Sequence, residues 1–244
     1  MKNQTKIIRL IIISLLALTS CINNSTDTKE QSLEVDNSEA NTTSSSSNTS
    51  TFFKEVSIGK QVWMSENLNV ERFRNGDIIP EAKSANEWKA YSDAGEAAWC
   101  YYNNDPANGN KYGKLYNWYA VKDPRGLVPM GWHVPTAEEW NVLTDYLGGA
   151  EIAGAKMRSK DSYGTNSSGF SALLGGYRSN DGTFYNSEAQ GDWWSSSDYL
   201  FTDQQGNPIS DNGVSCRLNY NSGILIFFYI HDKGHGFSVR CIKD

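Results

Sequence analysis

An abrupt change of composition near residue 51 is the strongest constraint on how this chain can fold. Residues 41–51 (NTTSSSSNTST) contain only Asn, Thr and Ser, and residues 22–40 carry scattered acids without apolar periodicity. Such a segment cannot bury enough surface to offset the entropy lost on ordering. All eight tryptophans lie in residues 52–244, which are enough for one domain with a sizeable core. We therefore predict a disordered tether over residues 21–51 and one folded domain over residues 52–244.

Residues 1–20 have the pattern of a secretory signal peptide. A basic stretch, residues 2–9, precedes an apolar stretch, residues 10–18. The apolar stretch is about half of the roughly 20 residues needed to span a bilayer. The sequence LTSC that ends at Cys21 resembles the lipobox of bacterial lipoproteins, which predicts cleavage before Cys21 and lipidation of that residue. An ordinary signal peptide with an incidental cysteine is the alternative.

Lipidation would place the protein in the cell envelope. Several acyl chains make a stable membrane anchor. Ile22, and not aspartate, follows Cys21, which favours the outer membrane and leaves the face on which the domain lies open. Loss of Lys2, Lys6 and Arg9 with the signal peptide lowers the formal net charge from −6 to −9. So acidic a chain is poorly suited to bind nucleic acid or an anionic membrane surface.

The clearest helix signal follows Pro135. Thr136 suits an N-cap, and Glu139 three residues later completes a capping box. Apolar residues then recur on one helical face, and a Gly-Gly pair at residues 148–149 ends the pattern. Weaker helix signals cover residues 115–122 and 85–91.

The remaining signals are strands and turns, so the fold class is α+β with two principal helices and antiparallel strands. Gly59-Lys60 separates two apolar stretches and predicts a hairpin. The apolar stretch at residues 224–230 (ILIFFYI) should be a central or covered strand, because an exposed one invites aggregation. The predicted strands are residues 52–58, 61–64, 170–174, 193–197, 214–220, 224–230 and 237–242.

Seven motifs in order resemble one family, the Fibrobacter succinogenes major paralogous domain. They are IGKQVWMSENLNV, AWCYYNNDP, YGKLYNWYAV, GWHVPTAEEWNVLTDYLGG, TNSSGFSALLGGYR, WWSSS and GFSVRCIKD. The resemblance covers residues 52–244. It implies a secreted or lipid-anchored protein of the kind found in Fibrobacteres and Bacteroidetes, and no general activity is established for the family. A looser similarity to the C-type-lectin-like fold implies N- and C-terminal strands that lie close together.

Each chemistry found on that fold has to be matched to residues. The Glu-Pro-Asn and Trp-Asn-Asp triplets of calcium-dependent lectins are absent, although the oxygen-rich segment at residues 103–110 offers Asn103 and Asp105 to a calcium ion. Turn chemistry explains that segment equally well. His231 and His235 read as exposed turn residues and not as a zinc site, and His133 has no evident partner. No cofactor is therefore expected, with calcium the one alternative.

Cys100, Cys216 and Cys241 remain after Cys21. An exported domain meets an oxidising compartment, so one disulfide is expected. The resemblance favours a bridge between Cys100 and Cys241, because both occupy family motif positions, AWC and VRC. A bridge between Cys216 and Cys241 is the rival pairing.

Trp193 and Trp194 are the first candidates for ligand contact. Neighbouring residues of a strand point to opposite faces, so one tryptophan can lie in the core while the other is exposed near Asp192. An exposed tryptophan could stack on a sugar, but core packing beside a serine-rich edge is the favoured interpretation.

We therefore expect a lipid-anchored binding module for a polysaccharide, a peptide or an envelope protein. The second hypothesis is a structural or assembly component of the envelope without a small ligand. An enzyme related to the formylglycine-generating enzymes ranks third, because the asparagine-valine-tryptophan-glutamate segment typical of those enzymes is absent.

Overall fold

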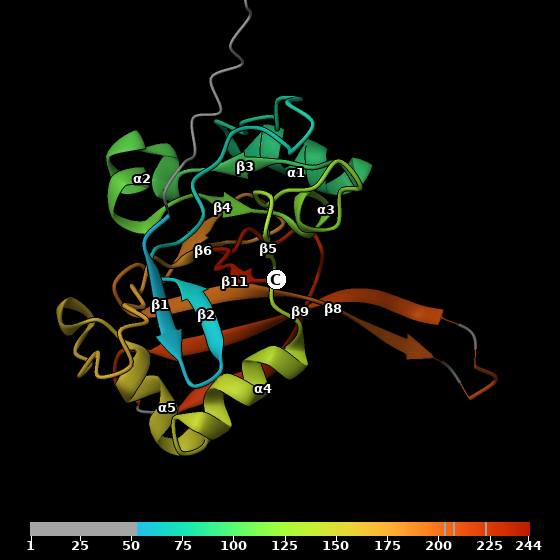
Figure 1. Ribbon diagram of the computed structural model, residues 1–244. Helices are drawn as coiled ribbons and strands as arrows, with labels where there is room; N and C mark the ends of the chain where they lie inside the picture. The colour runs from blue at the N-terminus through green and yellow to red at the C-terminus, as the bar shows by residue number, and fades with distance from the viewer. Residues whose placement is uncertain (1–52, 203, 207, 223) are drawn as a thin grey trace, which may run out of the picture. The chain divides into compact units, whose positions relative to one another are not determined.

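The two ends of the folded domain meet in one antiparallel sheet (Figure 1). Its strand order is β1 (Glu55–Ile58), β2 (Gln61–Met64), β11 (Ile242–Lys243) and β5 (Trp132–His133). Ile242 lies opposite Trp63 on one side and opposite His133 on the other. The expected closeness of the N- and C-terminal strands is confirmed, as is the hairpin that turns at Gly59-Lys60.

This computed structural model describes residues 53–202, 204–206, 208–222 and 224–244. Ser50–Asp244 form one compact unit. The predicted signal peptide, Cys21 and the tether lie outside the described residues. Among the residues within them, no helix is both long and apolar enough to cross a membrane.

A second, three-stranded sheet has the order β10 (Leu225–His231), β9 (Pro208–Asn219) and β8 (Gln190–Thr202). The β8–β9 ladder is antiparallel, and its far end projects from the body of the domain (Figure 1). Residues 224–230 therefore form an end strand and not a central one, and α5 (Ala150–Met157) lies against it. Two short antiparallel pairs complete the strands: β3 (Trp99–Cys100) with β4 (Leu115–Tyr116), and β6 (Tyr177–Arg178) with β7 (Phe184–Tyr185).

The helix predicted after Pro135 is confirmed as α4 (Ala137–Tyr146), with both halves of the capping box formed by Thr136 and Glu139. The weak signal near residue 85 is α1 (Ala85–Ala94), which has a capping box of its own. The prediction of two principal helices is wrong, because α1, α4 and α5 have 10, 10 and 8 residues. α5 was missed because it begins directly after the Gly-Gly pair that ends α4.

One predicted helix and two predicted strands also differ from the structure. Residues 237–242 form a strand only at Ile242, while Phe237 and Ser238 make isolated bridges. Residues 115–122 are split into β4 and the short α3 (Trp118–Val121), because Asn117 caps the helix through the backbone N–H of Ala120. Residues 170–174 form a loop with one isolated bridge, Arg158 to Ala172. The oxygen-rich segment contains a 3-10 turn, η1 (Tyr102–Asn104), and α2 (Pro106–Tyr112), while a further 3-10 turn, η2 (Lys160–Ser162), follows α5.

The core consists of three clusters of buried apolar side chains, and every tryptophan is buried. One cluster lies around Trp63, Trp140 and Trp193, where the rings of Trp63 and Trp140 are 4.8 Å apart. A second contains Trp118 and Trp194, with ring centroids 5.1 Å apart. β8 therefore separates two clusters, since its adjacent tryptophans point into different ones.

Candidate functional site

The two tryptophans predicted to contact a ligand do not reach the surface. Trp193 and Trp194 do point in opposite directions, but each is 0% exposed. Their indole N–H groups are also used internally: Trp193 donates to Asn67 Oδ1 at 2.9 Å and Trp194 to the carbonyl of Tyr116 at 2.8 Å. The hypothesis of an exposed tryptophan is wrong and the favoured core-packing interpretation is confirmed, because β8 has a core cluster on both faces.

Asp192 is also inaccessible. Its side chain is fully buried and accepts hydrogen bonds from Arg217 Nε at 2.7 Å and from Gln190 Nε2 at 2.5 Å. Burial raises the pKa of Asp192, although the Arg217 guanidinium favours the ionised form. Asp192 is therefore part of an internal ion pair and cannot contact a ligand from solvent.

Asn103 and Asp105 are exposed but have local structural roles. Asp105 caps α2, since its Oδ1 accepts from the backbone N–H of Ala107 at 2.9 Å, and Pro106 occupies the first turn. Asn103 adopts a left-handed backbone conformation with φ 55° inside η1. Among the residues that the structure describes, no group of three or more His, Cys, Asp or Glu side chains could hold a metal ion.

The predicted Cys100–Cys241 disulfide is wrong. Cys100, Cys216 and Cys241 are buried free thiols, and each belongs to a different core cluster. The rival Cys216–Cys241 pairing fails for the same reason. Burial raises the pKa of both Cys100 and Cys241 to about 12, so neither is a ready nucleophile.

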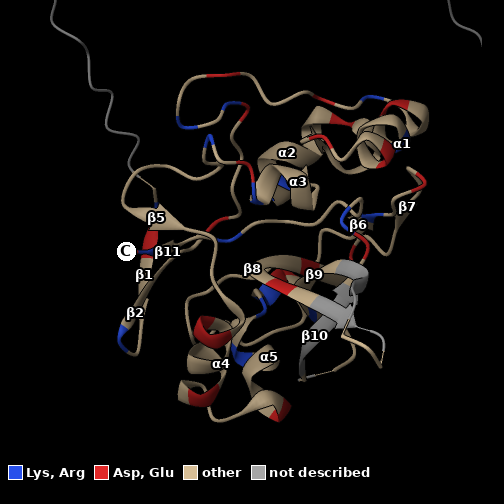
Figure 2. Ribbon diagram, turned by 90° about the vertical axis from the view of Figure 1, so that its right-hand side faces the viewer, with Lys and Arg blue, Asp and Glu red and all other residues tan. Residues whose placement is uncertain are grey.

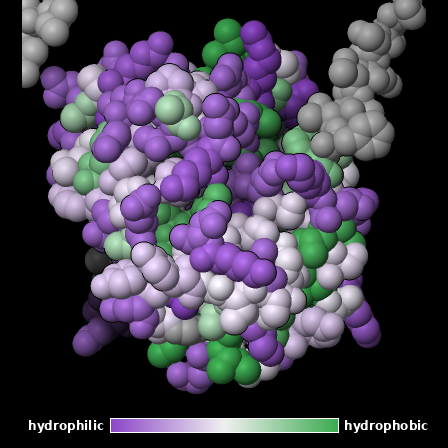
Figure 3. Space-filling model, turned by 90° about the vertical axis from the view of Figure 1, so that its left-hand side faces the viewer, coloured by the Kyte–Doolittle hydropathy of each residue, from purple (hydrophilic) through white to green (hydrophobic). Residues whose placement is uncertain are grey.

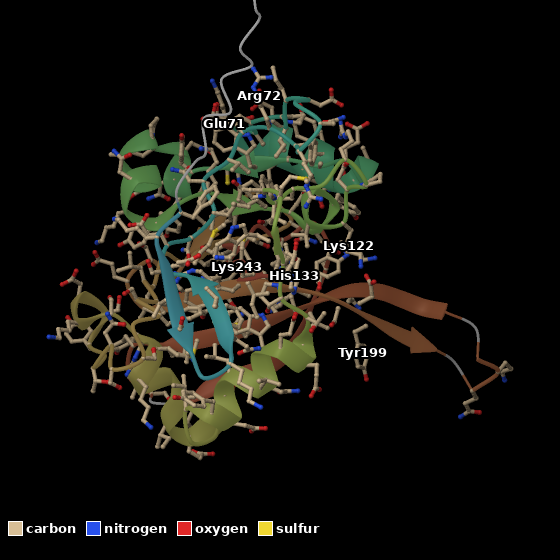
Figure 4. The ribbon with its side chains drawn as sticks, in the orientation of Figure 1. Glu71, Arg72, Lys122, His133, Tyr199 and Lys243 are labelled. Atoms are coloured by element: carbon tan, nitrogen blue, oxygen red, sulfur yellow. The ribbon has the colours of Figure 1, made fainter. Side chains whose placement is uncertain are left out.

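His133 has two carboxylate partners, contrary to the sequence prediction. Its Nε2 lies 2.8 Å from Glu139 Oε1, and its Nδ1 lies 2.7 Å from Asp244 Oδ1. Partial burial by itself lowers the pKa of His133, but these two contacts outweigh it and the pKa is raised. Figure 4 shows His133 near the middle of the domain with Lys243 beside it, where β5 and β11 pair. The charge-assisted contacts fasten β11 to the start of α4.

The prediction that His231 and His235 are exposed turn residues is wrong, since His231 ends β10, both are half-buried, and their rings converge in space. Their ring centroids are 5.1 Å apart, and both rings pack against Phe237. Burial lowers the pKa of His231 to about 3 and also lowers that of His235. Arg217 Nη2 lies 3.4 Å from His231 Nε2, which disfavours a bound cation there.

A set of polar groups lines two adjoining depressions on the side of the domain that carries α2. The larger has a volume of about 850 Å³ and the smaller about 510 Å³. They share Lys111, Asp161 and Leu173, so we treat them as one groove, called the polar groove below. Figure 3 faces this side, on which hydrophilic side chains predominate around a hollowed region.

Amides and hydroxyls dominate the larger depression. Its walls come from the loop after β2, the end of α2, η2 and the loop that follows η2. The neutral polar lining consists of Asn67, Asn69, Asn110, Asn166, Ser65, Ser159 and Ser171. Side chains that both donate and accept hydrogen bonds match the hydroxyl groups of a sugar.

Asn67 and Asn69 connect this lining to two buried cations. Asn67 Oδ1 accepts from Arg240 Nη2 at 2.7 Å, while Asn69 Oδ1 accepts from Lys114 Nζ at 2.6 Å. Arg240 and Lys114 are 1% and 2% exposed. Asn67 Nδ2 also donates to the carbonyl of Tyr112 at 2.8 Å, at the end of α2. One wall of the groove is therefore fixed from the core.

Gly113 lets α2 approach this wall. Its φ is +75°, a conformation that other residues rarely adopt, and an added Cβ would lie 2.8 Å from the carbonyl oxygen of Leu68. The backbone N–H of Lys114 donates to that same oxygen at 3.2 Å. Only glycine permits this close contact.

The groove gathers unusual backbone conformations. Tyr163, Asn166, Ser171 and Glu188 all line it and all have positive φ values, between 50° and 63°. Asn166 and Ser171 hold one another, because Asn166 Oδ1 accepts from the backbone N–H of Ser171 at 2.9 Å. Strained residues of this kind concentrate at functional sites.

Two exposed tyrosines flank the smaller depression. Tyr163 is 77% exposed and Tyr220 is 49% exposed. Their rings present flat apolar faces at the surface, next to the amides of the larger depression. Stacking of an aromatic ring on a sugar face needs this combination of exposure and neighbouring hydrogen-bonding groups.

A separate depression of about 590 Å³ lies around Lys122 and Arg125. Its charged groups are paired with one another: Lys122 lies 3.2 Å from Asp198, and Arg125 lies 2.8 Å from Asp123. Its lining also contains no Asn, Gln, Ser or Thr, whereas the larger depression of the polar groove has seven Asn and Ser residues, so the polar groove is the better candidate site.

The family model for the Fibrobacter succinogenes major domain matches residues 56–243. The chain belongs to this family. The sequence resemblance is thus confirmed, and the matched span takes in β1 through β11 except Glu55, with the whole polar groove except Lys54. No curated protein and no solved structure matches the chain.

Sequence reasoning missed the groove because its residues are scattered from Lys54 to Arg240. One signal was available in the family motif IGKQVWMSENLNV, where Asn67 and Asn69 flank the buried Leu68. Because successive side chains of an extended segment point to opposite sides, two amides that flank a buried leucine indicate a segment with one apolar side and one polar side.

We expect Asn67→Ala to destabilise the domain by about 3 kcal/mol, because three N–H donors of Arg240 and Trp193 lose their shared acceptor. Urea unfolding followed by tryptophan fluorescence measures the change. Asn110→Ala, on the exposed rim of the same depression, is the matched control, with an expected loss below about 0.5 kcal/mol. Equal losses in the two variants would contradict the role given to Asn67.

The two kinds of histidine predict opposite pH effects. Because the folded-state pKa of His133 is raised, its contribution is fully present below the unfolded pKa of 6.5 and is lost as pH rises through the folded value. The stability advantage of wild type over His133→Gln should therefore shrink from about pH 5.5 to about pH 8.5.

The control for this effect is His235→Gln. The folded-state pKa of His235 is lowered, so wild type is penalised below pH 6.5 and gains relative to this variant as pH rises. Thermal unfolding of the three proteins at several pH values measures both trends. A pH-independent difference for His133→Gln would show that its carboxylate contacts do not depend on charge.

Proposed function

We propose that this protein is a lipid-anchored module of the cell envelope that binds polysaccharide in the polar groove. The observation that carries the proposal is the adjacency of the two depressions, one lined by amides and hydroxyls and the other flanked by Tyr163 and Tyr220. Multiple hydrogen-bonding groups and an aromatic face are the two elements of sugar recognition.

The location and fold are part of the same proposal. The lipobox-like LTSC at Cys21 and the polar segment after it suit a lipid anchor with a flexible spacer, on the outer membrane. Meeting of the chain ends between β2 and β11 is consistent with a C-type-lectin-like fold. The polysaccharide is placed in the groove and not at Trp193 and Trp194, since both tryptophans are buried.

A structural or assembly role in the envelope is the second candidate. The projecting β8–β9 ladder favours it, because a strand pair that leaves the body of a domain presents backbone groups to a partner chain (Figure 1). Crosslinking in intact cells, followed by identification of a stable protein partner, would favour this role if no glycan binds.

We expect Tyr163→Ala and Tyr220→Ala each to weaken polysaccharide binding about tenfold, through loss of ring stacking. A glycan array identifies the bound polysaccharide, and affinity electrophoresis on that polysaccharide measures the change. Tyr146→Ala is the control, because Tyr146 is 65% exposed on α4 and does not line the groove. Unchanged binding in both groove variants would rule out this site.

We expect Cys21→Ser to move the protein from the membrane fraction to the soluble fraction. Acylation of Cys21 supplies the membrane affinity, since the mature chain is acidic and has no electrostatic attraction to anionic lipid. Metabolic labelling with an alkyne fatty acid, combined with fractionation, measures both properties. Cys216→Ser is the control and should keep the label, and an unlabelled wild-type protein would refute the anchor.

A further inference from the structure

The charges of the larger depression are unbalanced toward positive. Four cations line it, namely Lys54, Lys111, Lys160 and Arg240, against two carboxylates, Glu66 and Asp161. Lys54 pairs with Glu66, and Lys111 lies 3.4 Å from Glu188 of the smaller depression.

Lys160 and Asp161 are the two exposed charged residues of the larger depression that remain, and they are neighbours in the chain. Lys160 and Asp161 make no ion pair within the described part of the chain. Asp161 lies at the junction with the smaller depression, which it also lines. Lys160 is therefore a cation of the larger depression that is available to a ligand.

Two buried guanidinium groups lie behind this surface without a carboxylate contact. Arg240 donates to Asn67 Oδ1 and to the carbonyls of Met64 and Phe170, and all three acceptors are neutral. Burial lowers the pKa of Arg240 to about 9, so it still carries its charge near neutral pH. A buried cation held only by neutral dipoles is incompletely compensated.

Arg158, the chain neighbour of the lining residue Ser159, repeats this arrangement. It is 5% exposed, and its Nη1 donates to the carbonyls of Asn219 and Tyr220. Its Nε has no hydrogen-bond partner within the described residues. Burial lowers the pKa of Arg158, with no carboxylate to oppose the effect.

Ser159, the next residue after Arg158, has a side-chain hydroxyl without a hydrogen-bond partner among the described residues. It lines the larger depression and is 8% exposed. A buried hydroxyl without a partner is unusual and calls for an explanation. The dipole of this buried hydroxyl is free to orient toward an anion held by the exposed Lys160.

The two halves of the polar groove thus differ in charge. The smaller depression has one cation, Lys111, and two carboxylates, Asp161 and Glu188, together with the exposed rings of Tyr163 and Tyr220. It suits a neutral sugar ring, while the larger depression suits an anionic group. Arg158 connects them, since it contacts the carbonyl of Tyr220 from a position beside Ser159.

The rest of the domain has the opposite character. The whole chain has a formal net charge of −6, and α4 contains three acidic residues and no basic one. Figure 2, which faces the other side of the domain from Figure 3, shows acidic positions on α1 and α4. An acidic ligand would be repelled from α4 and attracted to the larger depression.

We propose that the polar groove selects acidic polysaccharides, with a carboxylate or sulfate group in the larger depression and a neighbouring neutral ring against Tyr163 and Tyr220. This inference rests on the proposed function of the groove and adds the class of ligand. Lys160 contacts the anionic group, while the hydroxyl dipole of Ser159 and the charges of Arg240 and Arg158 act from the buried side of the depression.

The test uses matched pairs of polymers that differ in charge. Polygalacturonate is compared with fully methyl-esterified pectin, carboxymethylcellulose with hydroxyethylcellulose, and dextran sulfate with dextran, by affinity electrophoresis of the full folded protein. We expect binding to at least one acidic member, about tenfold weaker or absent binding to its neutral partner, and weakening of the acidic interaction by salt. The carboxylated and sulfated pairs distinguish the two anionic groups.

The variant Lys160→Gln tests whether the acidic polymer binds in the larger depression. We expect it to weaken binding of the acidic polymer about fivefold through loss of one charge-assisted contact, without changing any binding of the neutral partner. Lys60→Gln, in the exposed β1–β2 turn away from the groove, is the matched control and should bind as wild type.

Three results would count against the inference. Equal binding of both members of every pair would overturn charge selection and leave polysaccharide binding intact. Absence of binding to every polymer would overturn the proposed function together with the inference. Equal weakening by Lys160→Gln and Lys60→Gln would show that general charge, and not the larger depression, attracts the acidic polymer.

Discussion

The hydrogen bonds of Asn67 are the interaction on which the rest of the structure depends. Its Oδ1 accepts from Arg240 and from Trp193, while its Nδ2 donates to the end of α2 at Tyr112. One short side chain thereby joins four segments: the loop after β2, α2, β8 and the C-terminal segment before β11. Each donor is buried or half-buried, so loss of the acceptor would leave polar groups without partners in the core.

The same network explains how a polar depression can be rigid. Loops usually hold their shape poorly, because few buried contacts restrain them. Here Asn67 and Asn69 are bound to the buried cations Arg240 and Lys114, and the ammonium of Lys114 also lies 4.4 Å from the centre of the Trp99 ring. The lining amides are therefore held in place from the core side, which reduces the entropy that a ligand must overcome on binding.

How far sequence reasoning succeeded can be followed in α4 and β8. Thr136 and Glu139 lie within one turn, so the capping box of α4 could be recognised from local chemistry alone. The alternation of Trp193 and Trp194 was also correct, because it follows from strand geometry. The exposure of one tryptophan was not, since β8 is packed on both faces by segments remote in the sequence.

The cysteines and His133 likewise show that contacts between remote segments could not be predicted from local patterns. Motif positions suggested that Cys100 and Cys241 pair, yet the fold buries them in separate clusters. His133 seemed to have no partner, but it contacts Glu139 of its own motif, and pairing of β5 with β11 brings Asp244 to it. The polar groove could not have been read from the chain order, because it joins loops from both ends of the domain.

The sequence by itself determined the family, the α+β class, the β1–β2 hairpin and the start of α4. These features rest on composition and on interactions between residues a few positions apart, which any local stretch of chain already contains. Only the tertiary structure decided which aromatic rings face solvent, which thiols are neighbours and what Asn67 binds. The contacts of Asn67 with Trp193 and Arg240 span 126 and 173 residues, and such pairings are fixed by packing of the whole domain and not by local pattern.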